Sequence, residues 1–338
     1  MSVAPGAGEE RSARRVLTLA ALALVVLVAL SLFVGRYPRP YWMPPELLGE
    51  DALARQLVLA LRAPRLVAAA LLGATLAASG FAMQMLFRNP LVEPGFLGVS
   101  QGAAFGAALA IVALDATAWG IQGLAAGGAL LALAATLALS RAFRFGAATL
   151  RLVLAGIAVS ALFASGVGLL KLMADPQRQL PEITFWMLGG LAGVGWRQLL
   201  AVLPAAAVSL LGMHLLRWRL NVLSLDDATA FSLGVAVRRE RRAILLLAVV
   251  GTAAMVSVAG MVGWLGLITP HLARRLVGAD ARRALPTATL LGALGAVACD
   301  DLARTLVATE IPLGLITSFV GAAAFAIGMA RPPGRVRG

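Results

Sequence analysis

Nine long apolar runs dominate the sequence, separated by short segments in which charged residues and prolines gather. Each run has about 18 residues or more, which lets a helix cross a bilayer core of about 30 Å. Such runs fold as helices because lipid offers no hydrogen-bond partner to an open strand edge. Hydrophobic residues make up 60% of the chain and charged residues 13%, whereas a water-soluble domain has about 25% charged residues. The sequence predicts an all-α polytopic membrane protein.

The first run, residues 16–34, follows a basic stretch from Arg11 to Arg15. It is long for the apolar part of a signal peptide, and no A-x-A-like cleavage site follows it. We therefore expect it to be the first membrane span.

The seventh run, residues 241–270, is too long for one simple crossing at about 1.5 Å per residue. A break near Gly260 would divide it into two short spans. With ten spans and both termini in the cytoplasm, 20 of the 29 Lys and Arg residues lie inside, and with nine spans only 14 do. Cytoplasmic loops carry the excess of Lys and Arg, so ten spans are favoured. They are expected at residues 16–34, 64–87, 96–114, 118–140, 150–173, 197–216, 241–259, 261–278, 285–307 and 311–330.

Few residues have the chemistry of a catalytic or metal site. Cys299 is the only cysteine, and neither histidine has a second His or Cys at ligand spacing. The only lysine, Lys171, is followed by leucine, whereas a Walker A loop needs lysine beside Ser or Thr. We expect no catalytic residue, no metal site, no cofactor bound by this chain and no enzyme activity. The net charge of +13 is attributed to arginines on one side of a membrane, and no nucleic-acid partner is expected.

The tract CDDLAR, residues 299–304, places two carboxylates and an arginine within a predicted span. Asp300 and Arg304 are four residues apart, so a helix would bring them together. Ionisable groups in a span are functional candidates. A local ion pair near the outer boundary explains the tract equally well.

The longest predicted cytoplasmic loop, residues 217–242, has a helical apolar pattern. Ser224 before Asp227 resembles an N-cap followed by an acidic residue, and Gly234 allows a turn between two short helices. Two amphipathic helices beside the membrane suggest a docking surface for a cytoplasmic partner. The alternative is a helix pair that lies in the lipid interface.

Several tracts in one order resemble the permease subunits of bacterial ABC importers for iron complexes, haem and cobalamin, the FecCD family. They cover most of the chain from Leu61 to Gly328. They include "LRAPRLVAAALLGATLAASGFAMQMLFRNPLVEPGFLGVSQGAAFGA", "RLVLAGIAVSAL", "FWMLGGLAGVGW", "LNVLSLDDATAFSLGVAVRR", "VAGMVGWLGLITPHLARRLVGADARRALP" and "DDLARTLVATEIPLGLITSFVGA".

The resemblance implies one permease domain over residues 1–338, with the ten-helix architecture of a type II ABC importer. It implies a homodimer in the bacterial inner membrane, two cytoplasmic ATPase subunits that hold ATP and Mg, and a periplasmic substrate-binding protein. The cargo would be a siderophore, haem or another metal chelate such as cobalamin. A molybdate-type oxyanion is the alternative cargo.

The resemblance also implies roles for individual residues. Residues 220–237 would be the coupling helices that contact the ATPase, with Ser224, Leu225, Asp226, Asp227, Ala230, Leu233, Gly234 and Val235. Docking of the binding protein would involve Arg62, Arg65 and Arg304. The cytoplasmic gate would include Asn89, Leu91 and Thr149. The tract from Phe185 to Trp196 would form a short helix at the periplasmic mouth.

The alternatives to such a permease are an ion-coupled secondary transporter and a membrane enzyme. An ion-coupled secondary transporter usually has buried ionisable groups at mid-membrane, whereas these groups cluster at span ends here. A membrane enzyme would need a catalytic constellation that the sequence does not offer. Both are less favoured than an ABC importer permease.

Overall fold

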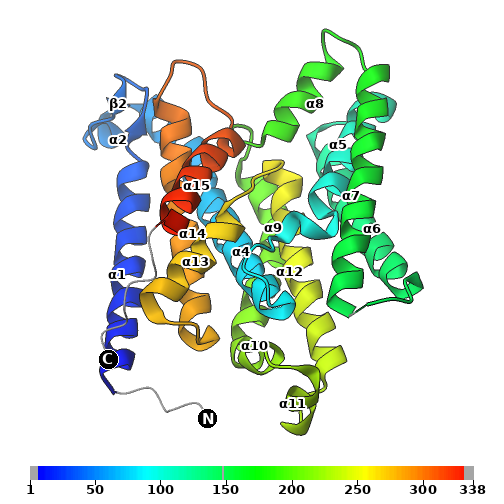
Figure 1. The fold of residues 1–338 in the computed structure, drawn as a ribbon. Helices are drawn as coiled ribbons and strands as arrows, with labels where there is room; N and C mark the ends of the chain where they lie inside the picture. Colours follow the sequence, from blue (N-terminus) through cyan, green and yellow to red (C-terminus); the bar gives the residue numbers. More distant parts are fainter. Residues whose placement is uncertain (1–6, 147, 331–338) are drawn as a thin grey trace.

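The computed structural model describes residues 7–146 and 148–330. Within them the chain is almost wholly helical, as predicted (Figure 1). Ten of these helices have 13 residues or more: α1 (Ala7–Ser31), α4 (Ala63–Phe87), α5 (Val99–Leu114), α6 (Ala118–Ala142), α7 (Ala148–Met173), α9 (Trp196–Leu215), α12 (Val237–Ala259), α13 (Leu265–Val277), α14 (Ala281–Thr305) and α15 (Leu313–Ala330). Seven helices of the described chain are long and apolar enough to cross a membrane, and α5 and α15 are shorter apolar helices.

Most of the short elements lie at the two ends of this bundle. One end carries the β1–β2 hairpin, α2 and α8, and the opposite end carries α10 and α11 (Figure 1). Helix α1 starts at the α10–α11 end, where Glu10 lies 3.7 Å from Arg283 of α14. The short elements are β1 (Val34–Gly35), β2 (Tyr41–Trp42), α2 (Leu47–Glu50), α3 (Ala52–Gln56), the π-helix η1 (Leu57–Arg62), the 3-10 helix η2 (Pro94–Leu97), α8 (Gln179–Leu188), α10 (Arg217–Leu223) and α11 (Asp227–Ser232).

Helix α4 lies at the centre of the bundle and packs against α14 at very short range. A Cβ atom added to Gly73 would lie 2.0 Å from the carbonyl oxygen of Gly292. Helix α4 approaches α13 equally closely, since a Cβ on Gly80 would lie 1.9 Å from the carbonyl oxygen of Gly266. Lipid provides little hydrophobic drive for helix association, so close backbone contact between small residues holds such helices together.

The long seventh run is divided at the glycine expected from the sequence. Helix α12 ends at Ala259, Gly260 has φ +66°, and α13 begins at Leu265. A positive φ is easily adopted by glycine and ends the helix without steric cost. The break therefore produces a helix of 23 residues and a helix of 13 residues in place of one long tilted helix.

Two helix starts lie much further from the expected spans than the others. Helix α1 begins at Ala7, nine residues before the apolar run, because the charged stretch before the run is helical as well. Helix α4 continues without interruption from α3 and η1, so one helical segment runs from Ala52 to Phe87. The C-terminal arginines that were counted on the inner side, Arg331, Arg335 and Arg337, lie outside the described residues.

Candidate functional site

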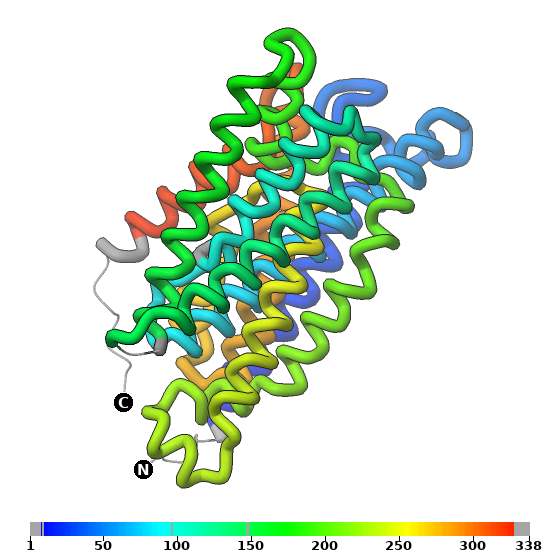
Figure 2. The backbone as a smooth tube through the Cα atoms, turned by 90° about the vertical axis from the view of Figure 1, so that its right-hand side faces the viewer, coloured from blue at the N-terminus to red at the C-terminus, as the bar shows by residue number. Residues whose placement is uncertain are grey.

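Helices α10 and α11 form an elbow, residues 217–236, that extends beyond the long helices at one end of the bundle (Figure 2). Its inner face is apolar: Leu223, Ala230 and Val235 have 0%, 1% and 2% of their surface exposed. Its outer face is apolar too, since Leu225, Phe231 and Leu233 are exposed by 42%, 76% and 60%. Large exposed apolar side chains on a rigid segment indicate a surface that contacts another molecule.

The N-cap of α11 is Asp226, and the assignment of this role to Ser224 was wrong. The Asp226 carboxylate accepts hydrogen bonds from the Thr229 backbone N–H at 3.0 Å and from the Thr229 hydroxyl at 2.6 Å. These bonds hold the pKa of Asp226 below its ordinary value. Ser224 instead follows the last residue of α10, where its hydroxyl donates to the carbonyl of Asn221 at 2.7 Å.

Gly234 turns the chain from α11 towards α12 with φ +77°. Its N–H donates to the carbonyl of Phe231 at 2.9 Å, and the N–H of Val235 donates to the carbonyl of Ala230 at 3.3 Å. These bonds close the end of α11 in the way that glycine with a left-handed backbone usually does. The predicted turn at Gly234 is present.

An ionic contact ties the elbow to the bundle through Asp227. The Asp227 carboxylate lies 2.8 Å from Arg241 of α12 and 3.6 Å from Arg88 at the end of α4. Arg88 also donates to the carbonyl oxygen of Leu225. The hydrogen bond from Arg241 lowers the pKa of Asp227, so the carboxylate stays charged. Motion of α11 would therefore be felt at the ends of α4 and α12.

The predicted gate residues lie in two places. Asn89 follows α4, and its side-chain oxygen accepts from the N–H of Leu91 at 2.9 Å in a tight turn; the Leu91 side chain is 53% exposed. Thr149 lies in the first turn of α7, beside a cavity of about 510 Å³ that Asp227 also lines. This α11 cavity does not include Asn89 or Leu91 among its described lining residues.

The other end of the bundle holds an ionic cluster around Arg65. Arg65 lies 2.8 Å from Asp300 of α14 and 2.5 Å from Glu310 in the segment before α15. Asp300 is fully buried, and Arg65 is 8% exposed. Within this cluster a guanidinium contacts two carboxylates at once, which is the geometry that arginine favours.

Arg304 belongs to the same cluster, as the spacing in the sequence predicted. Its Nε lies 3.1 Å from Asp300, within ion-pair distance although the N–H is not aligned for a hydrogen bond. It also pairs with Asp301, which in turn accepts a hydrogen bond from the Ser31 hydroxyl of α1. The cluster thus joins α1, α4 and α14.

The predicted docking arginines are largely buried and bonded to groups of the same chain. Arg62 is 9% exposed and donates to the carbonyl of Leu32 at 2.9 Å. Arg62, Arg65 and Arg304 nevertheless line one shared cavity of about 490 Å³, together with Glu310. The structure therefore brings all three together, but with internal carboxylates beside two of them. Glu310 is the member of this cluster that sequence reasoning missed, and the pair between Asp301 and Arg304 was not predicted within the tract.

The tract from Phe185 to Trp196 is only partly helical. Helix α8 ends at Leu188, and the chain then runs without helix from Gly189, which has φ +70°, to Gly195. Gly190 donates to the carbonyl of Ala259 at 2.8 Å, which packs this segment against the break that follows α12. The glycines end the helix and allow close approach, so the expected short helix stops midway through the tract.

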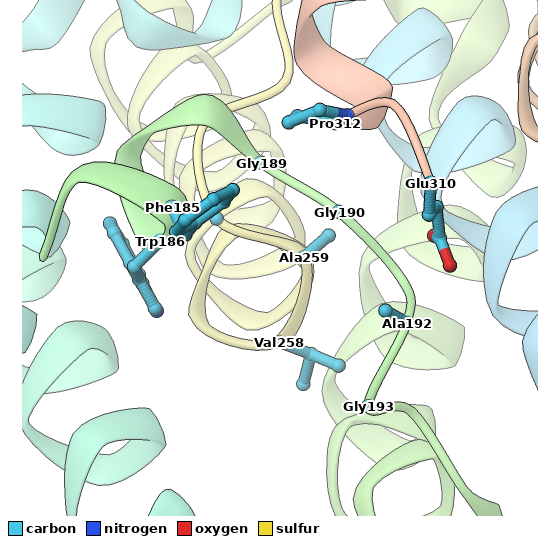
Figure 3. A pocket seen from close by; sticks show the side chains of 11 residues that line it. Phe185, Trp186, Gly189, Gly190, Ala192, Gly193, Val258, Ala259, Glu310 and Pro312 are labelled. Carbon is cyan, nitrogen blue, oxygen red and sulfur yellow. The ribbon is translucent and has the colours of Figure 1, made fainter. Parts of the chain in front are cut away.

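This glycine segment borders a cavity of about 240 Å³ near the break in the seventh run (Figure 3). Phe185 and Trp186 of α8 lie on one side, and Glu310 lies on the other, beyond Gly190 and Ala192. Gly314 of α15 donates to the carbonyl of Gly189 at 3.3 Å. Glu310 is thus placed between the ionic cluster and this cavity.

No group of three metal-ligating side chains occurs among the described residues. The arrangement consists of an exposed elbow at one end, a buried ionic cluster at the other, and a helical bundle between them. Such an arrangement fits a membrane subunit that is contacted at both ends.

Comparison with known proteins defines the class. The model of the FecCD transport family matches residues 23–331, and the chain belongs to this family. The chain is 37% identical over 316 residues to the molybdate import system permease protein MolB of Haemophilus influenzae, covering 90% of this chain and 92% of the relative. It is 36% identical over 339 residues to the vitamin B12 import system permease protein BtuC of Klebsiella pneumoniae, covering 97% of each.

A third relative is the hemin transport system permease protein HmuU of Yersinia pestis, at 41% identity over 273 residues, 77% of this chain and 79% of the relative. Among solved structures, an inward-facing conformation of a metal-chelate type ABC transporter superposes with a TM-score of 0.86 at 35% identity, over 94% of this chain and 99% of that chain. The chain is therefore a multi-pass membrane permease subunit of an ABC transporter, and not an enzyme. The predicted family and architecture are confirmed.

Proposed function

We propose that the chain is the permease of an inner-membrane ABC importer and works as a homodimer. Two ATPase subunits on the cytoplasmic side would bind ATP and Mg, and a periplasmic binding protein would deliver the cargo. Both termini would lie in the cytoplasm, on the side of α10 and α11. The observation that carries this proposal is the elbow, which presents apolar side chains outward while Asp227 ties it to α4 and α12.

The elbow is the proposed contact with the ATPase. Ser224, Leu225, Asp226 and Asp227 shape its first half, and Ala230, Leu233, Gly234 and Val235 shape its second half. Closure of the ATPase pair would push α11, and the Arg88 contact would pass this motion to the turn at Asn89 and Leu91. A ligand that binds one state better moves a two-state assembly in this way.

The ionic cluster is the proposed contact with the binding protein. Arg62, Arg65 and Arg304 line one cavity at the opposite end of the bundle. Carboxylates on a binding protein would orient it there through charge-assisted hydrogen bonds and speed its encounter. Within this chain Glu310 pairs with Arg65 at 2.5 Å, so a carboxylate of the binding protein would compete with Glu310.

The cargo that we propose is an iron complex, such as a siderophore or haem, or a related chelate such as cobalamin. The relatives named for hemin and vitamin B12 support this assignment. A molybdate-type oxyanion is the second candidate, which the match to the molybdate permease over 90% of the chain favours. An ion-coupled transporter is not supported by membership in this family.

Reconstituted vesicles would test the proposal. The chain, its ATPase and its binding protein would be assembled in liposomes, and uptake of a siderophore complex, haem, cobalamin and molybdate would be measured in parallel. We expect uptake of one cargo that needs the ATPase and stops with vanadate. Uptake that continues without the ATPase would contradict the proposal.

A further inference from the structure

The α11 cavity gathers an excess of positive charge. It lies between the end of α6 and the starts of α7 and α12, and α11 forms part of its wall. Five arginines and one carboxylate line it: Arg141, Arg151, Arg238, Arg241, Arg242 and Asp227. The role of this cavity is not explained by the proposed contacts of the elbow.

The one carboxylate among the described residues that line this cavity is already paired with arginines. Asp227 pairs with Arg241 at 2.8 Å and with Arg88 at 3.6 Å. Across the described chain, no carboxylate lies within ion-pair distance of Arg141, Arg238 or Arg242. Like charges gathered in a partly enclosed space repel one another, so an anion in the cavity would lower the energy.

Two donors in the wall are buried without an acceptor. The Nε atoms of Arg151 and Arg241 have no hydrogen-bond partner among the described atoms. The Arg151 side chain is nevertheless held in place, because its Nη1 donates to the carbonyl of Phe143 at 3.1 Å. Buried donors are normally satisfied, and an unsatisfied one indicates a missing ligand or water. The hydroxyls of Ser140 and Thr149 also line the cavity.

The rest of the wall is apolar. It is formed by Leu86, Phe87, Leu137, Leu152 and Leu245. The arginines stand where three long apolar helices end, which is the level at which lipid headgroups lie. A free inorganic anion would use only the arginines, whereas a phospholipid would use both parts of the wall.

From these observations we propose that the α11 cavity binds the phosphate group of an anionic phospholipid. The phosphate oxygens would accept hydrogen bonds from Arg141, Arg151 and Arg242, and an acyl chain would lie along the leucines. Basic pockets between membrane helices on the cytoplasmic side suit such headgroups. The bound lipid would touch both the start of α7 and the elbow.

The test is lipid binding by the full-length chain, purified and delipidated in a neutral detergent. Phosphatidylglycerol, phosphatidylcholine, glycerol phosphate and inorganic phosphate would be titrated, and bound lipid would be counted by native mass spectrometry. We expect phosphatidylglycerol to bind in preference to phosphatidylcholine. The double variant Arg141→Gln/Arg242→Gln should bind it roughly 30-fold more weakly, because each basic side chain near anionic lipid contributes about 1 kcal/mol and 1.4 kcal/mol is tenfold.

The chain offers a matched control, Arg144→Gln/Arg239→Gln. These two exposed arginines lie within three residues of Arg141 and Arg242 but do not line the cavity. The control variant should retain the affinity of the unaltered chain. Equal losses in the two double variants would overturn the site. If inorganic phosphate or glycerol phosphate bound as tightly as phosphatidylglycerol, the acyl chains would contribute nothing. That result would overturn the lipid as the ligand of this cavity.

Discussion

Arg65 of α4 and Asp300 of α14, 235 residues apart in the sequence, meet at 2.8 Å in the buried part of the ionic cluster. Asp300 also lies 3.1 Å from Arg304, so one carboxylate contacts two arginines. This contact joins the two helices that already pack at Gly73 and Gly292. The ionic cluster is therefore part of the bundle, in addition to its proposed part in docking.

Replacement of Asp300 by asparagine should destabilise the protein strongly. The change keeps the size of the side chain but removes the fully buried carboxylate that contacts both arginines, so Arg65 keeps only Glu310 and Arg304 keeps only Asp301. Loss of one partner of a buried ion pair costs up to about 3–5 kcal/mol. Denaturant unfolding in detergent would measure the free energy of unfolding. Asp115→Asn is the control, because its pair with Arg178 is exposed and should contribute no more than about 1 kcal/mol. Similar losses in the two variants would contradict the role of Asp300.

Removal of the charge on Glu310 should tighten docking of the binding protein. Glu310→Gln leaves Arg65 paired with Asp300 and frees its outer side for a partner carboxylate. In this pair the Arg65 side chain is 10% and the Glu310 side chain 34% exposed. Release of Arg65 at the open side of the pair is worth about 1 kcal/mol, so affinity should rise by about fivefold. Biolayer interferometry with the purified binding protein would measure it. Glu50→Gln makes the same change of charge at the same end, and an equal gain there would show that Glu310 does not compete.

A β-branched residue at Gly234 should uncouple the elbow. No atom lies within 4 Å of a Cβ added there, so the effect of Gly234→Val comes from the φ of +77° and not from a clash. A left-handed backbone costs an ordinary residue about 1–2 kcal/mol. We expect cargo-stimulated ATPase activity of the assembled importer to fall. Gly234→Asn should retain most of the activity, because asparagine tolerates this conformation; equal losses would argue against the turn.

The contact between α4 and α14 should tolerate no added methyl group. Gly73→Ala would place its Cβ 2.0 Å from a backbone oxygen, and overpacking of this kind costs about 1–3 kcal/mol. Gly127→Ala on α6 meets nothing within 4 Å and should stabilise its helix by roughly 0.5–1 kcal/mol. Unfolding of both variants in one detergent would compare them. A stable Gly73→Ala protein would show that the helices can separate at no cost.

The sequence predicts much of this fold because the length of an apolar run and the position of a glycine determine structure within a few residues. The break at Gly260 and the turn at Gly234 follow from single residues and their neighbours. The N-cap of α11 was misassigned because Ser224 and Asp226 are both suitable residue types, and only the actual start of α11 distinguishes them. Both residue types are common at N-caps, so the choice between them depends on where the chain turns into α11, and a short stretch of sequence does not fix that point.

The partners of the docking arginines could not be foreseen for a different reason. The spacing of Asp300 and Arg304 predicts their contact on one helix, but Arg65 reaches Asp300 and Glu310 across the fold. A signal for Glu310 existed, since it is a lone acid in the short gap between two apolar runs. Its distance from Arg65 depends on how α4 and α14 cross, which the order of the residues does not encode directly.

Arg88 ends α4 with φ +51° and also holds the elbow through Leu225 and Asp227. This one residue thus has two separable roles: its backbone ends a helix, and its guanidinium holds the elbow in place. Asparagine would preserve the end of the helix and remove the guanidinium contact, whereas lysine would end the helix at the same backbone cost as arginine and preserve part of the contact. Comparison of the two replacements therefore separates the contribution of the guanidinium contact with the elbow from that of the helix end.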